Sequence, residues 1–374
     1  MKVLIVRSYG SVINTNMYNC QEIGLAKALS NRGIECGIVL FNGKEEDSTE
    51  ILEIKDCPNI VIYRLKGISI AKHGIMKSIN DIVEKYDVIW VNEFNQYTSY
   101  KLCKNFNKKT IIYHGPYSPT YSLIRWIRNY FCNKIFFDKK IANTTQVFTK
   151  SNLTKNDLLK LGFSNVKTIG VGLDINKIDI VGEKPQILKD IIKFKENKGV
   201  LLTYVGTIDP RKNTMMLLEI LNKLKHNDIK VKLLMIGKGN EKYINNCFKY
   251  IEENNLEEYI IYQKQINQDQ LKYIYENTNI FLLPTNYEIF GMVLLEAMYY
   301  KVPVITTKNG GSSTLIDDGK NGFICDGGVN EWINIIEKLI SDPKYSKQIG
   351  QKANSTIVNN FTWDAIADTV IKNI

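Results

Sequence analysis

Short apolar runs alternate with longer amphipathic stretches along nearly all of the 374 residues, and this alternation constrains the fold more than any other feature. Such a pattern predicts βαβ units, in which buried strands form a mainly parallel sheet covered by helices. The series occurs twice, and strand signals lapse between its two parts, over about residues 174–198. We therefore expect an α/β protein with two doubly wound domains, whose ligands bind at the carboxyl ends of the strands.

The two series also predict the domain boundaries. We expect a first domain over residues 1–175, a second over 176–358, and a final helical segment, 359–374, for which packing back on the first domain is one interpretation. The strands expected in the first domain are Lys2–Arg7, Glu35–Phe41, Ile60–Leu65, Asp87–Val91, Thr110–Tyr113 and Gln146–Thr149, with helices at Tyr18–Asn31, Ser69–Lys85, Gln96–Asn105 and Thr120–Lys140. Those expected in the second are Gly199–Val205, Lys230–Ile236, Tyr259–Tyr262, Ile280–Leu283, Val302–Thr306 and Gly322–Cys325, with helices at Thr214–Lys225, Glu241–Glu253, Gln268–Glu276, Gly291–Tyr300 and Glu331–Ser341.

Composition narrows the class of protein. The seven cysteines are scattered without a Cys-x-x-Cys pair, which argues against a zinc site and a disulfide framework. No apolar run reaches the ~18 residues of a membrane-spanning helix, and the apolar start is too short for a signal peptide, so we expect a cytoplasmic protein. The formal net charge of +10 suits nucleic acid, anionic lipid headgroups or phosphorylated substrates, and equally a compositional bias toward lysine.

The most informative segment is Leu283–Met298, where a strand ends, a loop follows and a helix begins near Phe290–Gly291. The backbone N–H groups at such a helix start form an anion site suited to a diphosphate, and a glycine there permits close approach of the ligand. Glu288 and Glu296 can accept hydrogen bonds from vicinal hydroxyls of a ribose or hexose. Alternatively, Glu288 only complements the helix dipole and Glu296 lies on a solvated face. The candidate backbone contacts are Phe290, Gly291, Met292 and Val293.

With the segment that follows, this stretch resembles the family 4 retaining glycosyltransferases of the GT-B fold. The family signature is a Glu-x7-Glu motif, then a small-x-x-x-Gly/Lys-x-Pro-Val-Ile strand, a Gly-Gly turn and an acidic-Gly-x-x-Gly loop. Glu288 and Glu296 match the first motif, and Pro303, Gly310, Gly311 and Gly322 match the later positions. The resemblance implies two Rossmann-like domains facing a central cleft, with Glu296 on the ribose of a nucleotide-sugar donor and Glu288 as a catalytic contact to its sugar.

A second match lies in Tyr204–Asn213, which resembles the family's Val-Gly-Arg-x-x-x-x-Lys-Gly segment. The resemblance places Gly206, Thr207 and Lys212 at the donor, where the Lys212 ammonium stabilises the negative charge that transfer leaves on the phosphate. Thr207 stands where arginine is usual, and Arg211 is a candidate substitute for it. Asn213 stands where glycine is usual. The alternative interpretation of Lys212 is a surface lysine.

Three looser matches complete the expected site. His114 ends a strand before a glycine and resembles the family's histidine beside the donor sugar, although a structural role is an equal alternative. Gly10 follows the first strand, in the loop that faces the donor phosphates. Ile266 lies where family members hold the base through backbone groups, but Lys264 replaces the usual glycine, so the base stays open.

The resemblance implies a retaining, metal-independent hexosyltransferase without a cofactor, since no Asp-x-Asp motif or His/Asp cluster is present. The donor would be a UDP- or GDP-sugar and the acceptor a saccharide or a lipid-linked molecule, in the synthesis of surface polysaccharide or another glycoconjugate. One alternative is a nucleotide-sugar epimerase of the same fold, because fold alone does not determine function. Another is a non-catalytic basic binding protein, although no nucleic-acid motif supports a nucleic-acid partner.

The segment 121–140 carries basic residues among aliphatic and aromatic ones. Such a basic amphipathic helix can lie on an anionic membrane surface, which would make the protein peripheral at the inner membrane face. The alternative is an ordinary packed helix with a basic solvent face. The basic residues are Arg125, Arg128, Lys134, Lys139 and Lys140.

Overall fold

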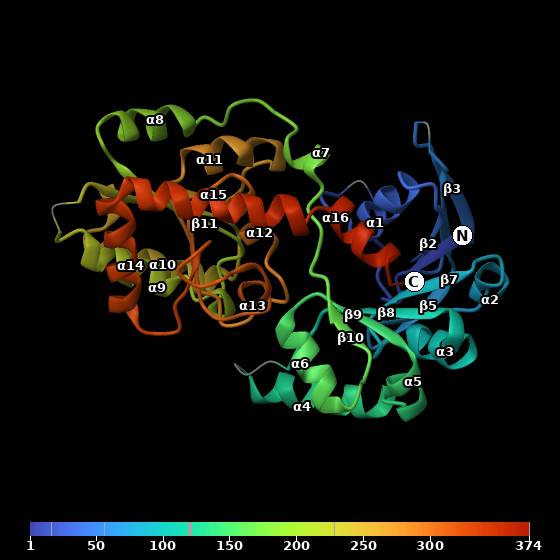
Figure 1. Ribbon diagram of the computed structural model, residues 1–374. Helices are drawn as coiled ribbons and strands as arrows, with labels where there is room; N and C mark the ends of the chain where they lie inside the picture. Colours follow the sequence, from blue (N-terminus) through green and yellow to red (C-terminus); the bar gives the residue numbers. More distant parts are fainter. Residues whose placement is uncertain (16, 56, 119–121, 228, 374) are drawn as a thin grey trace. The chain divides into compact units, whose positions relative to one another are not determined.

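The computed structural model describes residues 1–15, 17–55, 57–118, 122–227 and 229–373. The chain divides into two compact units: unit 1 is Met1–Asp174 with Phe361–Ile374, and unit 2 is Ile175–Asn360. Each unit contains a mainly parallel sheet flanked by helices (Figure 1), so the expected α/β class is confirmed.

Unit 1 is built on an eight-stranded sheet in the order β10-β9-β8-β7-β1-β2-β4-β3, in which only β3 runs antiparallel to its neighbour. Its strands are β1 (Lys2–Val6), β2 (Glu35–Phe41), β3 (Ser48–Leu52), β4 (Ile60–Leu65), β7 (Val88–Asn92), β8 (Thr110–His114), β9 (Gln146–Thr149) and β10 (Val166–Thr168). Its helices are α1 (Gln21–Ser30), α2 (Ile79–Val83), α3 (Tyr97–Asn105), α4 (Leu123–Phe136), α5 (Lys139–Thr144), α6 (Asn152–Leu161) and α16 (Trp363–Ile371).

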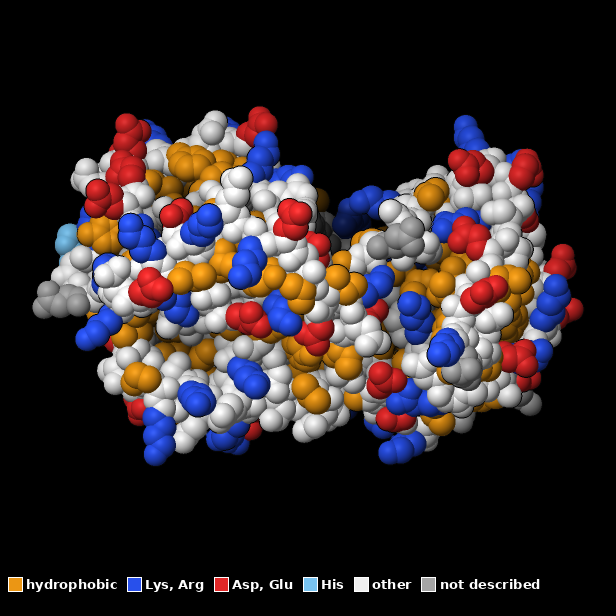
Figure 2. Space-filling model, turned by 90° about the horizontal axis from the view of Figure 1, so that it is seen from above, with side chains coloured by type: hydrophobic (Ala, Val, Ile, Leu, Met, Phe, Trp, Pro, Cys, Tyr) orange, Lys and Arg blue, Asp and Glu red, His pale blue; other side chains and the backbone are white. Residues whose placement is uncertain are grey.

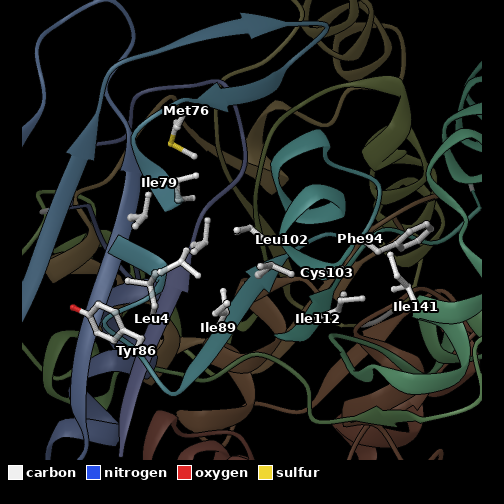
Figure 3. Close-up of a cluster of buried hydrophobic side chains, with 14 of the residues drawn as sticks. Leu4, Met76, Ile79, Tyr86, Ile89, Phe94, Leu102, Cys103, Ile112 and Ile141 are labelled. Carbon is white, nitrogen blue, oxygen red and sulfur yellow. The ribbon is translucent and has the colours of Figure 1, made fainter. Parts of the chain in front are cut away.

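One hydrophobic cluster of unit 1 lies on one face of this sheet (Figure 3). Side chains from the central strands, such as Leu4, Ile89 and Ile112, pack there against Leu102 of α3 and Ile141 of α5. On the other face α16 packs against α1, where the Trp363 indole donates to the Asn19 side chain at 2.9 Å. Burial of both faces explains why the strands read as continuous apolar runs.

The predictions of two helices in unit 1 are wrong. Residues 69–85 form not one helix but the end of a β-hairpin, made by β5 (Gly67–Ile70) and β6 (His73–Met76), followed by the short α2. The turn residues Ala71 and Lys72 adopt positive φ angles of 49° and 71°, and neither residue type signals such a turn. Residues 120 and 121 of the helix expected over 120–140 lie outside the described residues, and the remainder is not one helix but α4 and the start of α5. The chain breaks between them because the Asp138 carboxylate caps α5 by accepting the N–H groups of Lys140 and Ile141.

Unit 2 is built on a six-stranded parallel sheet in the order β13-β12-β11-β14-β15-β16. Its strands are β11 (Val200–Val205), β12 (Val231–Ile236), β13 (Ile260–Gln263), β14 (Ile280–Leu283), β15 (Val304–Thr306) and β16 (Phe323–Ile324). Its helices are α7 (Ile175–Ile178), α8 (Leu188–Glu196), α9 (Met215–Leu224), α10 (Glu241–Glu253), α11 (Leu271–Asn277), α12 (Met292–Tyr299), α13 (Ser312–Leu315), α14 (Val329–Ser341) and α15 (Pro343–Asn360), with short 3-10 turns η1 (Asn107–Lys109, in unit 1), η2 (Pro210–Lys212), η3 (Glu257–Tyr259) and η4 (Gln268–Gln270).

Candidate active site

The strand order of unit 2 indicates where a ligand binds. The chain starts in the middle of the sheet at β11, adds β12 and β13 on one side, and then crosses to β14 on the other. In open α/β sheets, ligands bind beyond the carboxyl ends of the strands at the point where the order reverses. Here that point lies between β11 and β14. The loops that leave these two strands, residues 206–214 and 284–291, therefore form the candidate site.

The two loops are hydrogen-bonded to each other. The Asn286 backbone N–H donates to the Arg211 carbonyl at 2.8 Å, and the Arg211 guanidinium donates to the Tyr287 carbonyl at 2.7 Å. The Thr285 hydroxyl also donates to the Arg211 carbonyl, at 3.4 Å. These bonds fix the direction of the Arg211 side chain, which lies toward the loop after β14.

Two cations meet one carboxylate at this junction. The Lys212 ammonium forms an ion pair with the Glu288 carboxylate, and a guanidinium nitrogen of Arg211 lies 3.8 Å from the same oxygen. The Lys212 side chain is only 9% exposed and that of Glu288 is 20% exposed. The interpretation of Lys212 as an ordinary surface lysine is therefore wrong, because its ammonium is held at the strand ends.

The loop after β11 explains two departures from the family pattern. Gly206 follows the last residue of the strand, and the hydroxyl of Thr207, in place of arginine, donates to the Asp209 carboxylate at 2.7 Å. Asp209 also caps η2 by accepting the Lys212 backbone N–H at 3.0 Å. Asn213, in place of glycine, has a φ of 51°, and asparagine is among the side chains that tolerate this left-handed conformation best.

The loop after β14 leads into the start of α12. Gly291, at the N-cap, has a φ of 80°, a conformation that favours glycine, and Phe290 before it is buried. Met292 and Val293 form the first turn, so the positive end of the helix dipole lies beside Glu288. The sequence therefore placed the start of this helix within two residues.

The turn at Gly310 and Gly311 packs against the loop after β14. The Gly310 N–H donates to the Glu288 carbonyl at 2.9 Å. A Cβ atom on Gly311 would lie 1.7 Å from the Phe290 carbonyl oxygen, and one on Gly310 would lie 2.0 Å from that of Ile289. Only glycine permits this approach, so the turn fixes the backbone that carries Glu288 to the helix start.

Glu296 is buried within unit 2, with only 3% of its surface exposed. Its carboxylate accepts hydrogen bonds from the Tyr275 hydroxyl at 2.8 Å and from the Gln268 amide at 3.5 Å. The alternative that Glu296 lies on a solvated face is therefore wrong. Gln268 begins η4, two residues after the half-buried Ile266, so the Glu296 carboxylate is bonded to the turn that follows the loop after β13.

In unit 1, three further strand ends bring charged side chains together. His114, at the end of β8, is buried, and its Nδ1 lies 2.6 Å from an oxygen of Glu93, which follows β7. Glu93 also accepts the Gly115 N–H at 3.0 Å and the Lys150 ammonium at 3.4 Å, the latter from the residue after β9. Burial favours the neutral acid, but the charges of Lys150 and His114 outweigh it and lower the pKa of Glu93 to about 2.

Glu93 and Lys150 are not among the residues predicted from the sequence, although a signal for them exists. Each follows directly on a buried strand, and the carboxyl ends of parallel strands meet at one edge of a sheet. The φ of Glu93 is 61°, so a non-glycine residue is held here in a conformation that few residues adopt. Gly10 lies in the loop after β1, where a Cβ atom would be 2.3 Å from the Ser69 hydroxyl oxygen of the β5–β6 hairpin.

The described residues contain no group of three or more His, Cys, Asp and Glu side chains arranged to hold a metal ion. In the same part of the chain, no helix combines the length and apolar character needed to cross a bilayer.

Comparison with known proteins gives a consistent result. The family model described as "Glycosyl transferases group 1" matches residues 186–356, which lie within unit 2. The chain is 30% identical over 222 residues to the capsular polysaccharide biosynthesis glycosyltransferase CapM of Staphylococcus aureus, covering 57% of this chain and 54% of that one. It is 25% identical over 214 residues to the alpha-1,3/1,6-mannosyltransferase ALG2 of Homo sapiens, covering 54% of this chain and 50% of that one. The aligned part thus spans about half the length of these curated relatives.

A solved structure extends the likeness to the whole fold. The Anabaena protein HepE in complex with UDP matches with a TM-score of 0.69 over 100% of this chain and 99% of its own, at 17% sequence identity. At that identity, the likeness concerns the fold alone.

Proposed function

Because the family model described as "Glycosyl transferases group 1" matches residues 186–356, we propose that this chain is a glycosyltransferase that takes a sugar from a nucleotide-sugar donor bound in unit 2. The observation that carries the proposal is the convergence of Lys212 and Arg211 on Glu288 beside the start of α12. Two cations and the positive end of a helix dipole meet at a strand-order reversal, so a diphosphate that takes the place of the Glu288 and Asp209 carboxylates would find complementary charge there.

The charges assign roles to the residues of this site. The Lys212 ammonium and the start of α12, from Phe290 to Val293, hold the donor diphosphate, and Arg211 supplies the second cation in place of an arginine at Thr207. Glu288 is then released from Lys212 and contacts the donor sugar. Glu296 holds the nucleotide ribose, which requires the Gln268 amide to give up its long hydrogen bond. Gly206 and Ile266 provide backbone contacts.

The proposed reaction retains the anomeric configuration. The bond between the sugar C1 and the phosphate oxygen breaks, and the acceptor oxygen bonds to C1 on the same face. The acceptor proton moves to the departing phosphate oxygen, so no separate base, metal ion or cofactor takes part. Lys212 and Arg211 stabilise the negative charge that develops on that phosphate.

The relatives suggest the substrates. HepE was crystallised with UDP, which favours a UDP-sugar over a GDP-sugar as donor, and CapM acts in capsular polysaccharide biosynthesis, which favours a saccharide or lipid-linked acceptor. The expected roles of His114 and Gly10 beside the donor stay predictions. The contact of the His114 Nδ1 atom with Glu93 holds the imidazole in one orientation.

A panel of UDP-, GDP- and ADP-sugars, assayed for nucleotide release, tests the proposal. We expect slow release from one donor, lost in Lys212→Gln and kept in Lys249→Gln, whose lysine is exposed on α10. Conversion of a donor to a new nucleotide sugar without release would indicate an epimerase instead. Absence of donor binding by calorimetry across the panel would contradict the proposal.

A nucleic-acid-binding protein is less well supported. On the face drawn in Figure 2, Lys and Arg side chains are interspersed with Asp and Glu side chains rather than gathered in one basic stripe. The +10 charge is therefore not concentrated on that face.

A further inference from the structure

Helix α4 exposes an unusually apolar surface on unit 1. Scattered single apolar side chains are common on protein surfaces, but a continuous group of large ones marks a site of interaction. Those of α4 are between 40% and 80% exposed. They are Leu123, Ile124, Trp126, Ile127, Tyr130, Phe131 and Ile135.

The exposed side chains follow the helical repeat. Ile124, Ile127, Phe131 and Ile135 are spaced by three or four residues, so they form one stripe along the helix. The end of the helix is anchored to unit 1 through Phe136, whose ring lies 5.2 Å from that of His73 and 5.8 Å from that of Tyr100. The stripe is therefore the outer face of a packed helix, not an unplaced segment.

The charged side chains of segment 122–140 are mostly basic, although Asp157 of α6 lines a pocket together with Trp126 and Tyr130. Arg128, Lys134, Lys139 and Lys140 are exposed, and none is paired with a carboxylate among the residues that the structure describes. The only acidic residue in 122–140 is Asp138, whose carboxylate caps α5. The rings of Trp126 and Tyr130 stack with their centres 5.6 Å apart, and the Lys134 ammonium lies 6.0 Å from the centre of the Tyr130 ring.

We infer that unit 1 docks on an anionic lipid surface through α4, with the apolar stripe among the acyl chains and the four cations at the headgroups. The helix has 14 residues and is therefore about 21 Å long, too short to cross a bilayer but long enough to lie in its interface. A second copy of this chain fits less well, because a two-fold interface would bring both sets of unpaired cations together. This inference goes beyond the proposed function and does not depend on it.

Flotation of the full chain with vesicles tests the inference. We expect the protein to bind phosphatidylcholine vesicles that contain phosphatidylglycerol. Its binding to vesicles of phosphatidylcholine alone should be weaker by about tenfold or more. The variant Ile124→Ser/Phe131→Ser/Ile135→Ser should lose at least about tenfold in binding, since it removes most of the inserted area. Its matched control is Ile180→Ser/Val181→Ser in unit 2, where the two side chains are 54% and 56% exposed; this control should bind normally.

The charge contribution is tested in the same way. Lys134→Gln/Lys139→Gln/Lys140→Gln should weaken binding to the anionic vesicles about tenfold or more, in a salt-dependent manner. Lys344→Gln/Lys347→Gln/Lys352→Gln removes equal charge from exposed lysines of α15 and should change binding little. Equal losses in both variants would reduce the effect to net charge and overturn the inference.

Tryptophan fluorescence gives a site-specific reading. Of the four tryptophans, Trp126 is 43% exposed, whereas Trp90, Trp332 and Trp363 are at most 5% exposed. Brominated lipid should therefore quench the wild-type protein, and Trp126→Phe should bind equally but show little quenching. Three results would overturn the inference. The first is equal binding to neutral and anionic vesicles, and the second is binding that survives the triple serine substitution. The third is a dimer, seen in sedimentation velocity, that this substitution dissociates.

Discussion

The Lys212 ammonium and the Glu288 carboxylate form an ion pair that joins the loop after β11 to the loop after β14. These are the two strands between which the order of the unit 2 sheet reverses. The pair thus marks the place where an α/β sheet binds its ligand. It also holds a nearly buried ammonium in a fixed orientation.

The first prediction concerns this ammonium. Lys212→Gln should lower the rate of nucleotide release about a hundredfold or more, because a preorganised cation at the leaving phosphate is lost. Steady-state release from the accepted donor measures the effect, with Lys249→Gln as the control. A rate near that of the wild-type protein would show that Lys212 serves only to hold Glu288.

The second prediction concerns Arg211, the candidate substitute for the arginine that the family usually has at the position of Thr207. Arg211→Gln should raise the Kd for the donor about tenfold to a hundredfold, the loss expected for one charge-assisted hydrogen bond. Adding Thr207→Arg to this variant should restore part of the affinity, because it returns a cation to the position that the family usually uses. Calorimetric donor binding measures both steps. If Arg211→Gln alone binds donor normally, the second cation is not Arg211.

How far the sequence predicts this fold depends on how local the signal is. The buried strands β2, β4, β9 and β14 fall at the residues expected, because apolar runs between polar turns define their own ends. The hairpin of β5 and β6 was missed, because its turn at Ala71 and Lys72 uses residues without a turn preference. The break before α5 depends on one capping carboxylate, Asp138, inside an otherwise helical pattern.

In the candidate site, too, local features could be predicted from the sequence, whereas contacts between separate strands could not. The helix start after β14 follows from a local strand–loop–helix pattern, whereas the approach of Arg211 to Glu288 depends on β11 and β14 being neighbours. Glu93 and Lys150 meet His114 only because β7, β8 and β9 are adjacent in the sheet. Sequence patterns predict strands well but do not state their order, so contacts between strand ends are the part that could not be predicted.

The third prediction tests the Gly-Gly turn. Gly311→Ala should lower the free energy of unfolding by about 1–3 kcal/mol, since its Cβ would overlap the Phe290 carbonyl oxygen. Donor binding should weaken as well, because the Phe290 backbone precedes the start of α12. Urea unfolding and calorimetry measure the two effects. Gly328→Ala is the control, because no atom lies within 4 Å of a Cβ atom built on Gly328 and the substitution affects only the N-cap of α14. An equal loss of stability in this control would argue against a role of the close contact at Gly311.

The last prediction follows from the lowered pKa of Glu93. A carboxyl group whose pKa falls from its usual 4.5 to about 2 on folding stabilises the folded protein at any pH above 4.5. That stability is lost as the pH falls from about 4.5 toward 2, where the folded carboxylate takes up its proton. Glu93→Gln should therefore be a few kcal/mol less stable than the wild-type protein at pH 7, and this difference should shrink at pH 3.5. Urea unfolding at both pH values measures it, with the exposed Glu253→Gln as control. A difference that does not change with pH would mean that Glu93 acts through packing and hydrogen bonds, not through its charge beside Lys150 and His114.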